Sequence, residues 1–526
     1  MKMTMPGFLS ESRFRQLLVV LVWGIIITLI GSVPYLYGFL REDKVFGVYL
    51  GRSVVNSADT YIFLSHIESV KQGELLLPNL YNSYPRDAYF IKPIYILIGL
   101  LAAIFDLNSL LIFHVSRFIL SVLFFATLWV LIGLILSKFN EKFLAFVLVS
   151  TSSGLGFFLK EKLPMSVDLW VPEAITFFSN MEAPHFIWSQ IGILILAIAL
   201  LKFHATGKII FLVIGSIFAA LTVLEHPYLI PFLLLFPPLF LIISSDNIRA
   251  YVISCLAVVA LPFLFAIFLY ILYQNSDGLS QYNKQVILLT PPVLNVLAGY
   301  GILTPLAIYG IIKGKVEDSG RYLLILWAIL LAILIYMPFP FQRRLLETFH
   351  LPIAISASLV FFNLNFKNIF SKFLLIIFLI ILSAGNIYLT NFSIKTIASD
   401  TADSYSHHIY AQDMEGLLWV KENSSRDDMI LANFYYSNII PGITGRYVFS
   451  GHLYNTVDAR DKTAQIERFM EGTKSLRKEF VEKNKPKFIF LGKVDPYNSF
   501  RDSLIKDGFV PAWEKDGVTI LEVKTL

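Results

Sequence analysis

The sequence predicts a polytopic α-helical membrane protein with a small α/β domain at its C-terminal end. Of its 526 residues, 56% are hydrophobic and only 15% are charged, and the mean hydropathy of +0.66 lies well above that of soluble domains. Hydrophobic runs of about 20 residues, the length that crosses a bilayer, recur from residue 17 to about residue 391. Charge and turn residues then become dense, which predicts a folded aqueous domain over 392–526.

The first hydrophobic run, 17–40, follows Lys2, Arg13 and Arg15. It is longer than the apolar region of a signal peptide and lacks a small-residue cleavage site, so we expect it to remain as a span. The later runs predict further spans at 92–137, 142–159, 185–201, 209–225, 227–245, 250–273, 290–312, 322–338, 348–363 and 368–391. The predicted membrane domain therefore covers 1–391 with about 11 to 13 spans.

Basic residues predict which junctions between spans face the cytoplasm. They fall at every second junction: Lys138, Lys142, Lys202, Lys208, Arg249, the run 313–321, Lys367 and Lys372. The alternate junctions, including the loop 41–91 and the domain 392–526, are then extracytoplasmic. The stretch 92–137 must cross an odd number of times, and one span plus a half-inserted helix would satisfy that requirement.

The C-terminal domain alternates two kinds of pattern. Period-2 apolar runs predict strands at 429–433, 447–450, 487–492 and 519–523, and helices are predicted at 413–421 and 459–483. This alternation is typical of a small α/β unit. Within it, the segment IPGITGRYVFSGHLYNT, 440–456, offers Arg446 and His452 for contact with a sugar or phosphate, or forms turns around an edge strand.

Several classes of chemistry find no support in the sequence. The single cysteine, Cys255, excludes an intrachain disulfide framework. Phosphate-loop, dinucleotide-binding and nucleophile-elbow motifs are missing from the sequence, which speaks against ATP-driven transport and hydride transfer. The net charge of +5 reports membrane topology first, so nucleic acid is not an expected partner.

The loop after the first span has an informative order of residues. Asp59 is followed by Tyr61, an amphipathic run that ends at Gly73, a segment rich in Pro and Tyr, and the dipeptide Lys92–Pro93. This order resembles the first extracytoplasmic loop of the GT-C superfamily of glycosyltransferases, which includes protein O-mannosyltransferases and lipid A aminoarabinose transferases. Asp59 stands alone between Ala58 and Thr60, whereas many members of the superfamily carry two acids here.

The resemblance implies a GT-C-like helical bundle and transfer of a sugar, with inversion, from a polyprenyl-phosphate donor to an acceptor at the outer face. It implies that Asp59 is the catalytic base or a metal ligand, and that Lys92 lies near the lipid phosphate. Such a reaction needs a base for the acceptor hydroxyl and a cation for the leaving phosphate. The structural alternatives are a helix N-cap for Asp59 and interfacial snorkelling for Lys92.

Three other predicted outer junctions carry polar residues that a plain span does not need. These residues are Glu182, His185, Glu225, His226, Gln342, Arg343 and Arg344. Ionisable groups at membrane depth are costly and therefore candidates for substrate binding. Arginine binds phosphate oxygens with paired hydrogen bonds, so Arg343 and Arg344 fit a phosphate, or alternatively anionic lipid headgroups.

Glu182, His185 and His226 have the ligand types of a divalent cation such as Mg²⁺ or Mn²⁺, although their spacing matches no compact metal motif. The alternative interpretation is that these three residues cap helices at the membrane interface. Two rival functions remain: a carrier or flippase for a lipid-linked or anionic solute, and a scaffold whose tail binds a partner. Charges at the predicted outer ends of the spans favour an enzyme that acts at one membrane interface over a carrier. The expected partners of this enzyme are a polyprenyl-phosphate sugar donor and the surrounding membrane lipids. The sequence leaves the oligomeric state open.

Overall fold

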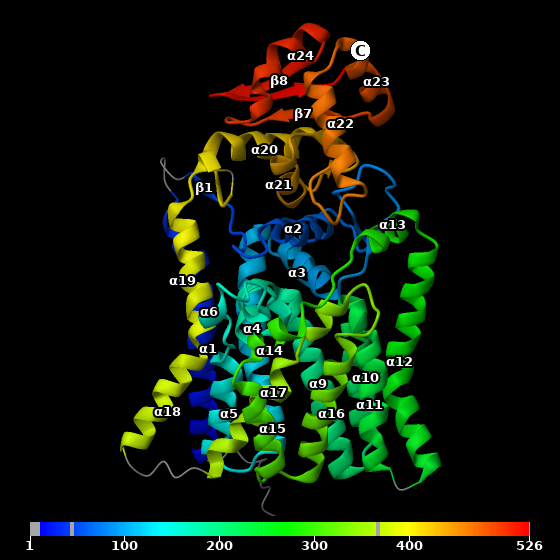
Figure 1. The fold of residues 1–526 in the computed structure, drawn as a ribbon. Coiled ribbons are helices and arrows are strands. Elements are labelled where there is room, and N and C mark those ends of the chain that lie inside the picture. The colour runs from blue at the N-terminus through cyan, green and yellow to red at the C-terminus, as the bar shows by residue number, and fades with distance from the viewer. Residues whose placement is uncertain (1–10, 43–46, 246, 364–368, 405, 525–526) are drawn as a thin grey trace, which may run out of the picture. The chain divides into compact units, whose positions relative to one another are not determined.

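The computed structural model describes residues 11–42, 47–245, 247–363, 369–404 and 406–524. Lys2 and Lys367, two of the basic residues used above, lie outside these residues. The chain divides into two compact units, whose elements are labelled in Figure 1. Unit 1 comprises Met1–Val33, Val115–Leu269 and Leu288–Phe392, and unit 2 comprises Pro34–His114, Tyr270–Ile287 and Ser393–Leu526.

Unit 1 is built from helices, and none of its described residues forms a strand. The helices within it are α5 (Phe139–Thr151), α6 (Gly156–Leu159), α7 (Val167–Trp170), η1 (Pro172–Ala174), α8 (Thr176–Glu182), α9 (Pro184–Thr206), α10 (Ile210–Glu225), η2 (Pro227–Leu229), α11 (Ile230–Leu241), η3 (Ile242–Ser244), α14 (Val293–Tyr300), α15 (Leu303–Lys313), α16 (Asp318–Leu334), η4 (Gln342–Leu346), α17 (His350–Ser358), η5 (Leu359–Asn363) and α18 (Ile369–Leu382). Four helices cross the boundary between the units: α1 (Glu11–Leu40), α4 (Ser109–Ile135), α12 (Ile248–Gln274) and α19 (Ala384–Ser399).

Every span predicted from hydropathy has a helical counterpart. Among the described residues, six helices are long and apolar enough to cross a membrane, and two bent pairs bring the number to eight if each pair is one span. The bent pairs are α14 with α15, at 69°, and α18 with α19, at 50°. The stretch 92–137 holds one short helix of 12 residues and one long helix of 27, and the half-inserted helix stays a prediction.

Small residues let the helices α9 and α10 approach closely. A Cβ atom on Gly192 of α9 would lie 2.2 Å from the Thr222 hydroxyl of α10, and one on Gly215 of α10 would lie 3.1 Å from Ala199. Such small side chains are typical of helix contacts in membranes, where packing drives association. Proline at the first position and a left-handed glycine after the last turn, Pro184 and Gly207, set the ends of α9.

Unit 2 combines a first-loop region with the C-terminal α/β region. Its elements are β1 (Val48–Tyr49), α2 (Ser57–Lys71), β2 (Leu77–Pro78), β3 (Tyr89–Phe90), α3 (Pro93–Ile104), α13 (Asp277–Gln285), η6 (Ala402–Ser404), β4 (His408–Ile409), α20 (Ala411–Asn423), β5 (Met429–Leu431), α21 (Phe434–Thr444), β6 (Tyr447–Val448), α22 (Ala459–Glu471), α23 (Lys474–Asn484), β7 (Phe488–Leu491), η7 (Pro496–Phe500), α24 (Arg501–Asp507), β8 (Val510–Lys515) and β9 (Val518–Glu522).

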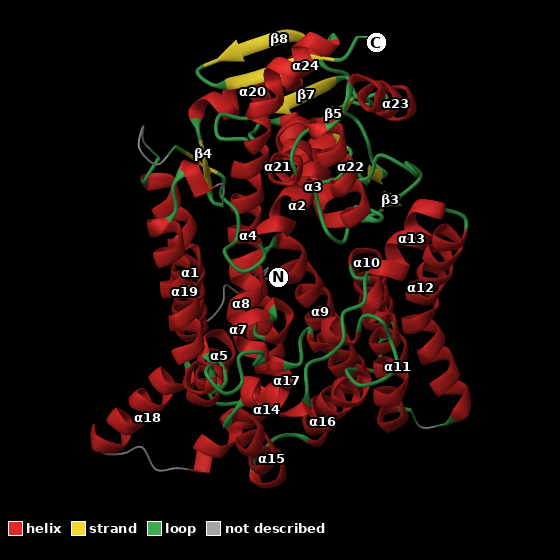
Figure 2. Ribbon diagram, turned by 45° about the horizontal axis from the view of Figure 1, so that its top comes forward, coloured by secondary structure: helices red, strands yellow, loops and turns green. Residues whose placement is uncertain are grey.

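The sheet of the C-terminal region has the strand order β6-β5-β7-β9-β8. Strand β5 runs parallel to β6 and β7, while β7 with β9 and β9 with β8 are antiparallel. The predicted strands at 429–433, 447–450, 487–492 and 519–523 correspond to β5, β6, β7 and β9. Figure 2 shows these strands in yellow among the helices of the same region.

One predicted helix, 459–483, is wrong. The structure has two helices there, α22 and α23, separated by Gly472 and Thr473. Arg477 of α23 donates hydrogen bonds to the carbonyls of Phe469 and Met470, which are in the last turn of α22. The buried guanidinium therefore satisfies carbonyl groups that a continuous helix would have bonded itself.

Candidate functional site

Asp59 lies in the first turn of α2, and its side chain is 43% exposed. The N-cap of this helix is Asn56, three residues earlier, so the interpretation of Asp59 as the N-cap is wrong. A carboxylate in the first turn is stabilised by the positive end of the helix dipole. Its exposed position nevertheless leaves Asp59 accessible to a molecule outside the protein.

The imidazole of His452 contacts this carboxylate. The Nε2 atom of His452 lies 3.0 Å from Oδ1 of Asp59, and the ring is only 5% exposed. The other ring nitrogen, Nδ1, accepts hydrogen bonds from the backbone N–H groups of Tyr454 and Asn455, both at 3.2 Å. Because Nδ1 is an acceptor, the ring proton is on Nε2, and His452 donates to Asp59.

A buried asparagine ties the same segments together. The side-chain amide of Asn438, on α21, donates to the carbonyls of Ala58 and Gly451, which adjoin Asp59 and His452 in the chain. The backbone carbonyl of Asn438 accepts from the Tyr81 hydroxyl at 2.9 Å. The backbone around Asp59 and the backbone around His452 are therefore held by one side chain.

Tyr61 packs where α2 meets α21. A Cβ atom on Gly442 of α21 would lie 2.6 Å from the Tyr61 ring, so only glycine permits this approach. The Tyr61 hydroxyl donates to the carbonyl of Leu50 at 3.0 Å. Burial raises the pKa of Tyr61, and the nearby charge of Arg52 opposes this effect. Tyr61, predicted as a substrate-binding residue, is buried here.

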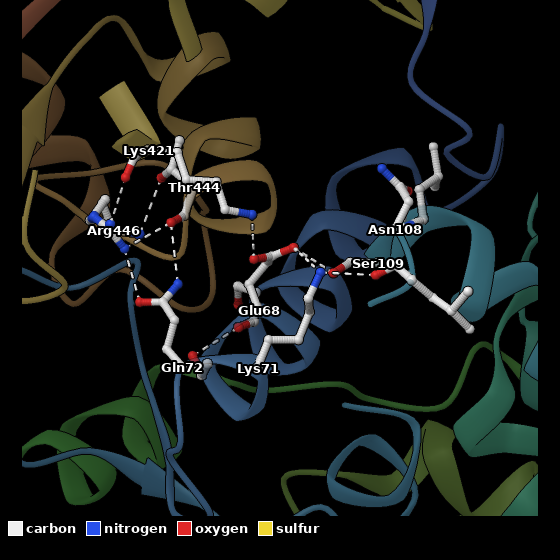
Figure 3. Close-up of polar contacts among 12 residues, drawn as sticks. Glu68, Lys71, Gln72, Asn108, Ser109, Lys421, Thr444 and Arg446 are labelled. Carbon is white, nitrogen blue, oxygen red and sulfur yellow. Dashed lines mark hydrogen bonds and ion pairs between the residues drawn. The ribbon is translucent and has the colours of Figure 1, made fainter. Parts of the chain in front are cut away.

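Figure 3 shows a polar network that also joins α2 to the C-terminal region. Lys421 of α20 lies 2.7 Å from the carboxylate of Glu68, which also accepts from Ser109. Arg446 directs all five of its N–H donors to protein acceptors; these are Ser424 Oγ, Gln72 Oε1 and the carbonyls of Thr444, Lys421 and Ser424. The sequence left two interpretations for Arg446, contact with a sugar or phosphate and a turn around an edge strand. The contacts fit the second.

Lys92 occupies the N-cap position of α3, directly before Pro93 at the start of that helix. Its charge reaches the interior of unit 2: burial, and secondarily the charge of Lys92, lower the pKa of His66 to about 3. His66 is buried on α2, seven residues after Asp59. Lys92 thus belongs to the same unit as Asp59 and acts electrostatically on the helix that carries Asp59.

The remaining predicted site residues all lie in unit 1. Glu182 ends α8, His185 lies in the first turn of α9, Glu225 ends α10, and all three side chains are buried. His226 follows Glu225, and its ring centroid lies 5.2 Å from that of His185. Four residues predicted from two different junctions are therefore buried, and the rings of two of them are in contact.

His226 has a carboxylate partner, Glu347, that the sequence did not predict. His226 Nδ1 lies 2.8 Å from Glu347 Oε2, and the Tyr228 hydroxyl donates to the same oxygen at 2.7 Å. The guanidinium of Arg344 lies over the Tyr228 ring at 5.2 Å, and that of Arg343 over the Trp170 ring at 4.7 Å.

The third residue of the predicted trio at this junction, Gln342, has local partners. Its side-chain oxygen accepts from the N–H of Thr290 at 3.2 Å, and its amide donates to the carbonyl of Met337 at 2.7 Å. Both partners lie in unit 1, so Gln342 connects the segments before α14 and after α16. The amide holds the backbone in the structure, and its predicted role in substrate binding stays a prediction.

The structure thus groups the predicted residues in two sets: Asp59, Tyr61 and Lys92 in unit 2, and the other seven in unit 1. Convergence of Asp59 with His226 and Arg343 stays a prediction. Among the described residues, no group of three or more His, Cys, Asp or Glu side chains is arranged to hold a metal ion. We derive no step through such an ion.

Two candidate functional residues, His452 and Glu347, were not predicted as site residues from the sequence. His452 was noted in its motif but was not placed with Asp59, because 393 residues separate them. Glu347 follows Arg344 by three residues, after the apolar pair Leu345 and Leu346. A carboxylate in that context is a signal that could have been used.

The apolar helices long enough to cross a membrane indicate a multi-pass membrane protein, and its fold resembles that of solved membrane glycosyltransferase structures. No family model and no curated protein sequence matches this chain. Solved structures do resemble it. The archaeal oligosaccharyltransferase AglB from Archaeoglobus fulgidus, in complex with an inhibitory peptide and a dolichol-phosphate, is 14% identical, with 91% of this chain and 70% of that chain covered at a TM-score of 0.54.

A second similar structure covers both chains almost completely. ArnT from Cupriavidus metallidurans bound to undecaprenyl phosphate is 9% identical, with 94% of this chain and 97% of that chain covered at a TM-score of 0.51. A further structure of the Archaeoglobus enzyme contains Zn and sulfate, at 16% identity, coverages of 90% and 67%, and a TM-score of 0.51. At these identities the likeness concerns the fold.

Proposed function

We propose that this protein transfers a sugar from a polyprenyl-phosphate donor to an acceptor hydroxyl at the outer face of the membrane. The observation that carries the proposal is the contact between Asp59 and His452: a half-exposed carboxylate whose orientation a buried imidazole fixes. The proposal is supported by the similar structures, which were solved in complex with a dolichol-phosphate and with undecaprenyl phosphate. Unit 2, including the C-terminal region, would then face away from the cytoplasm.

In this mechanism the Asp59 carboxylate accepts the proton of the acceptor hydroxyl as the oxygen attacks the sugar. His452 donates its Nε2–H to Oδ1, which holds the carboxylate plane in one orientation during the attack. Lys92 would neutralise the leaving phosphate. The roles of the unit 1 residues stay predictions: phosphate binding by Arg343 and Arg344, and substrate binding by Glu182, His185, Glu225, His226 and Gln342.

The test is transfer of radiolabelled sugar from a polyprenyl-phosphate donor in membranes, at matched protein abundance. Asp59→Asn should lower the rate about 100- to 10,000-fold, because a general base contributes that much. Folding should survive, since asparagine can still accept the His452 hydrogen bond and loses only a dipole contribution of about 0.3–1 kcal/mol. Lys92→Ala should weaken use of the donor by on the order of 2 kcal/mol.

Asp106→Asn is the matched control. Asp106 is an exposed aspartate of the same unit, and its φ of 48° is a backbone conformation that asparagine tolerates. It should transfer sugar like the wild type. Undiminished transfer by Asp59→Asn would remove Asp59 from the mechanism.

A carrier or flippase is the second candidate, because the bent pairs α14–α15 and α18–α19 are the kind of broken helices on which carriers depend. The two candidates differ in their need for a base. A carrier would move its lipid-linked solute equally well in Asp59→Asn, whereas a transferase would lose its product. Movement of a fluorescent polyprenyl-phosphate sugar across proteoliposomes, compared between wild type and Asp59→Asn, separates them.

A further inference from the structure

Arg52 is a buried cation in the first-loop region of unit 2. It is 4% exposed, and its guanidinium lies over the rings of Tyr61 and Tyr435 at 5.1 and 5.7 Å. Within the described part of the chain, its one hydrogen bond runs from Nη2 to Oδ1 of Asn438, at 3.1 Å. Its Nε atom is buried and has no hydrogen-bond partner among the described residues.

Two other buried arginines of unit 2 show what a satisfied guanidinium looks like here. Arg446 makes five hydrogen bonds with its five donors. Arg477 pairs with the carboxylate of Asp507 and makes three further hydrogen bonds. Arg52 forms no ion pair with any carboxylate that the structure describes. A buried charge without a counter-charge is costly, so proteins normally pair it.

Arg52 lies close to the proposed catalytic base. The Asn438 side chain that accepts from Arg52 also donates to the carbonyl of Ala58, the residue before Asp59. The charges of Arg52 and Asp59 act on the same buried phenol, since Arg52 lowers and Asp59 raises the pKa of Tyr81. One asparagine side chain thus separates the unsatisfied cation from the backbone of the base.

We propose that Arg52, with Asn438 and the rings of Tyr61 and Tyr435, binds an oxyanion of a substrate, a carboxylate or phosphate group, beside Asp59. A guanidinium offers paired N–H donors that match both groups, and the bound anion would supply the missing counter-charge. The assignment of this anion to a substrate of sugar transfer rests on the function proposed above; the binding of an oxyanion does not. The anion comes from the acceptor or from the phosphate of the donor.

Ligand binding to the full chain in detergent tests the site without requiring catalysis. The probes are two matched pairs, a polyprenyl phosphate with the free polyprenol and glucuronate with glucose, together with inorganic phosphate. A ligand that binds only the folded state raises the midpoint of thermal unfolding. We expect at least one anionic probe to raise it where its neutral counterpart does not, and Arg52→Gln to weaken that binding about 10- to 100-fold.

A matched control and a second variant make the result specific. Arg86→Gln also removes a guanidinium that lies over a tyrosine ring of unit 2, that of Tyr447, but at an exposed position, and should bind like the wild type. Arg52→Lys keeps the charge without the paired donors, so it should bind more weakly than the wild type and more tightly than Arg52→Gln.

The two sources of the anion give different results. A response to polyprenyl phosphate that is lost in Arg52→Gln identifies the donor phosphate. A response to glucuronate without a response to polyprenyl phosphate identifies an anionic acceptor, and a response to inorganic phosphate alone confirms the oxyanion site without naming its source. The proposal is overturned if no anionic probe binds better than its neutral counterpart, or if Arg52→Gln and Arg52→Lys bind every probe like the wild type. Asp59→Asn should still bind the anionic probe but should lose sugar transfer. Anion binding and sugar transfer are thus measured independently, so a failure of the oxyanion site can be told from a failure of the proposed function.

Discussion

The two units contain histidine–carboxylate pairs of similar length but opposite exposure. His452 lies 3.0 Å from Asp59 in unit 2, and His226 lies 2.8 Å from Glu347 in unit 1. The Asp59 side chain is 43% exposed, whereas that of Glu347 is 0% exposed and also accepts from the Tyr228 hydroxyl. The same pair of residue types therefore presents one carboxylate to an incoming molecule and encloses the other. Exposure decides which pair is suited to proton transfer with a substrate.

The largest expected difference between the pairs is in stability. Glu347→Ala removes the carboxylate that accepts from Tyr228 and lies 2.8 Å from His226 inside unit 1, and breaking a buried pair in this way typically costs about 3–5 kcal/mol. Asp59→Ala should cost less than about 1 kcal/mol, because a half-exposed carboxylate is solvated when its partner is lost. Thermal unfolding of the purified chain in detergent, followed by tryptophan fluorescence, measures both. Equal losses would contradict the distinction drawn from exposure.

Asp495 sharpens the comparison, because it is a carboxylate in the same unit as Asp59 but almost as buried as Glu347. Burial raises its pKa from 3.8 to about 6. The folded state thus holds the proton more tightly than the unfolded state, so stability is highest below about pH 4 and falls as the pH rises through about 6. The total loss is on the order of 3 kcal/mol.

The substitution Asp495→Asn should remove this dependence, since the amide can still accept the N–H of Tyr497 that the carboxylate accepts at 2.9 Å. Hydrogen exchange at the amides of β7, corrected for its intrinsic pH dependence, reports the local stability at pH 4 and pH 7. If the stability of the wild type relative to the variant were the same at pH 7 as at pH 4, burial would not be raising the pKa of Asp495.

The smallest expected effect concerns the orientation of Asp59. His452→Ala removes the donor to Oδ1 and should lower kcat about 10- to 100-fold with little change in KM, since misplacing a reacting group by about 1 Å costs that much. His452→Gln should restore most of the rate, because its amide can donate to Asp59 while its oxygen accepts the backbone N–H groups. Equal kcat values for the two variants would indicate that His452 supports the fold alone.

The fold was largely predictable from hydropathy, because each membrane helix must satisfy its own backbone and therefore forms a long apolar run. The fold of the C-terminal region was less predictable. Strand β8 was missed because its residues are mostly exposed, although Asp516 and Gly517, both with positive φ, form the two-residue turn typical of a hairpin. Helix α21 was missed because Pro441 and Gly442 oppose helix formation locally, and its packing against α2 stabilises it.

The candidate site was predictable only in part. Asp59 and Lys92 stood out by their position after the first span and before the second. Their surroundings depended on contacts across hundreds of residues, such as Asp59 with His452 and Arg52 with Asn438, which no local spacing encodes. No sequence motif marks Arg52, whose burial and unpartnered Nε atom among the described residues are visible only in the structure.

The network of Figure 3 has a consequence for the order of events during synthesis. Glu68 and its partner Lys421 are 353 residues apart. At about 5–20 residues per second, a ribosome needs roughly 18–70 s between making the first and the second. During that interval α2 lacks the ion pair with Lys421 and the packing of α21, so its buried face is exposed to chaperones and to aggregation. The Asp59 loop is therefore translated long before it can complete its native contacts.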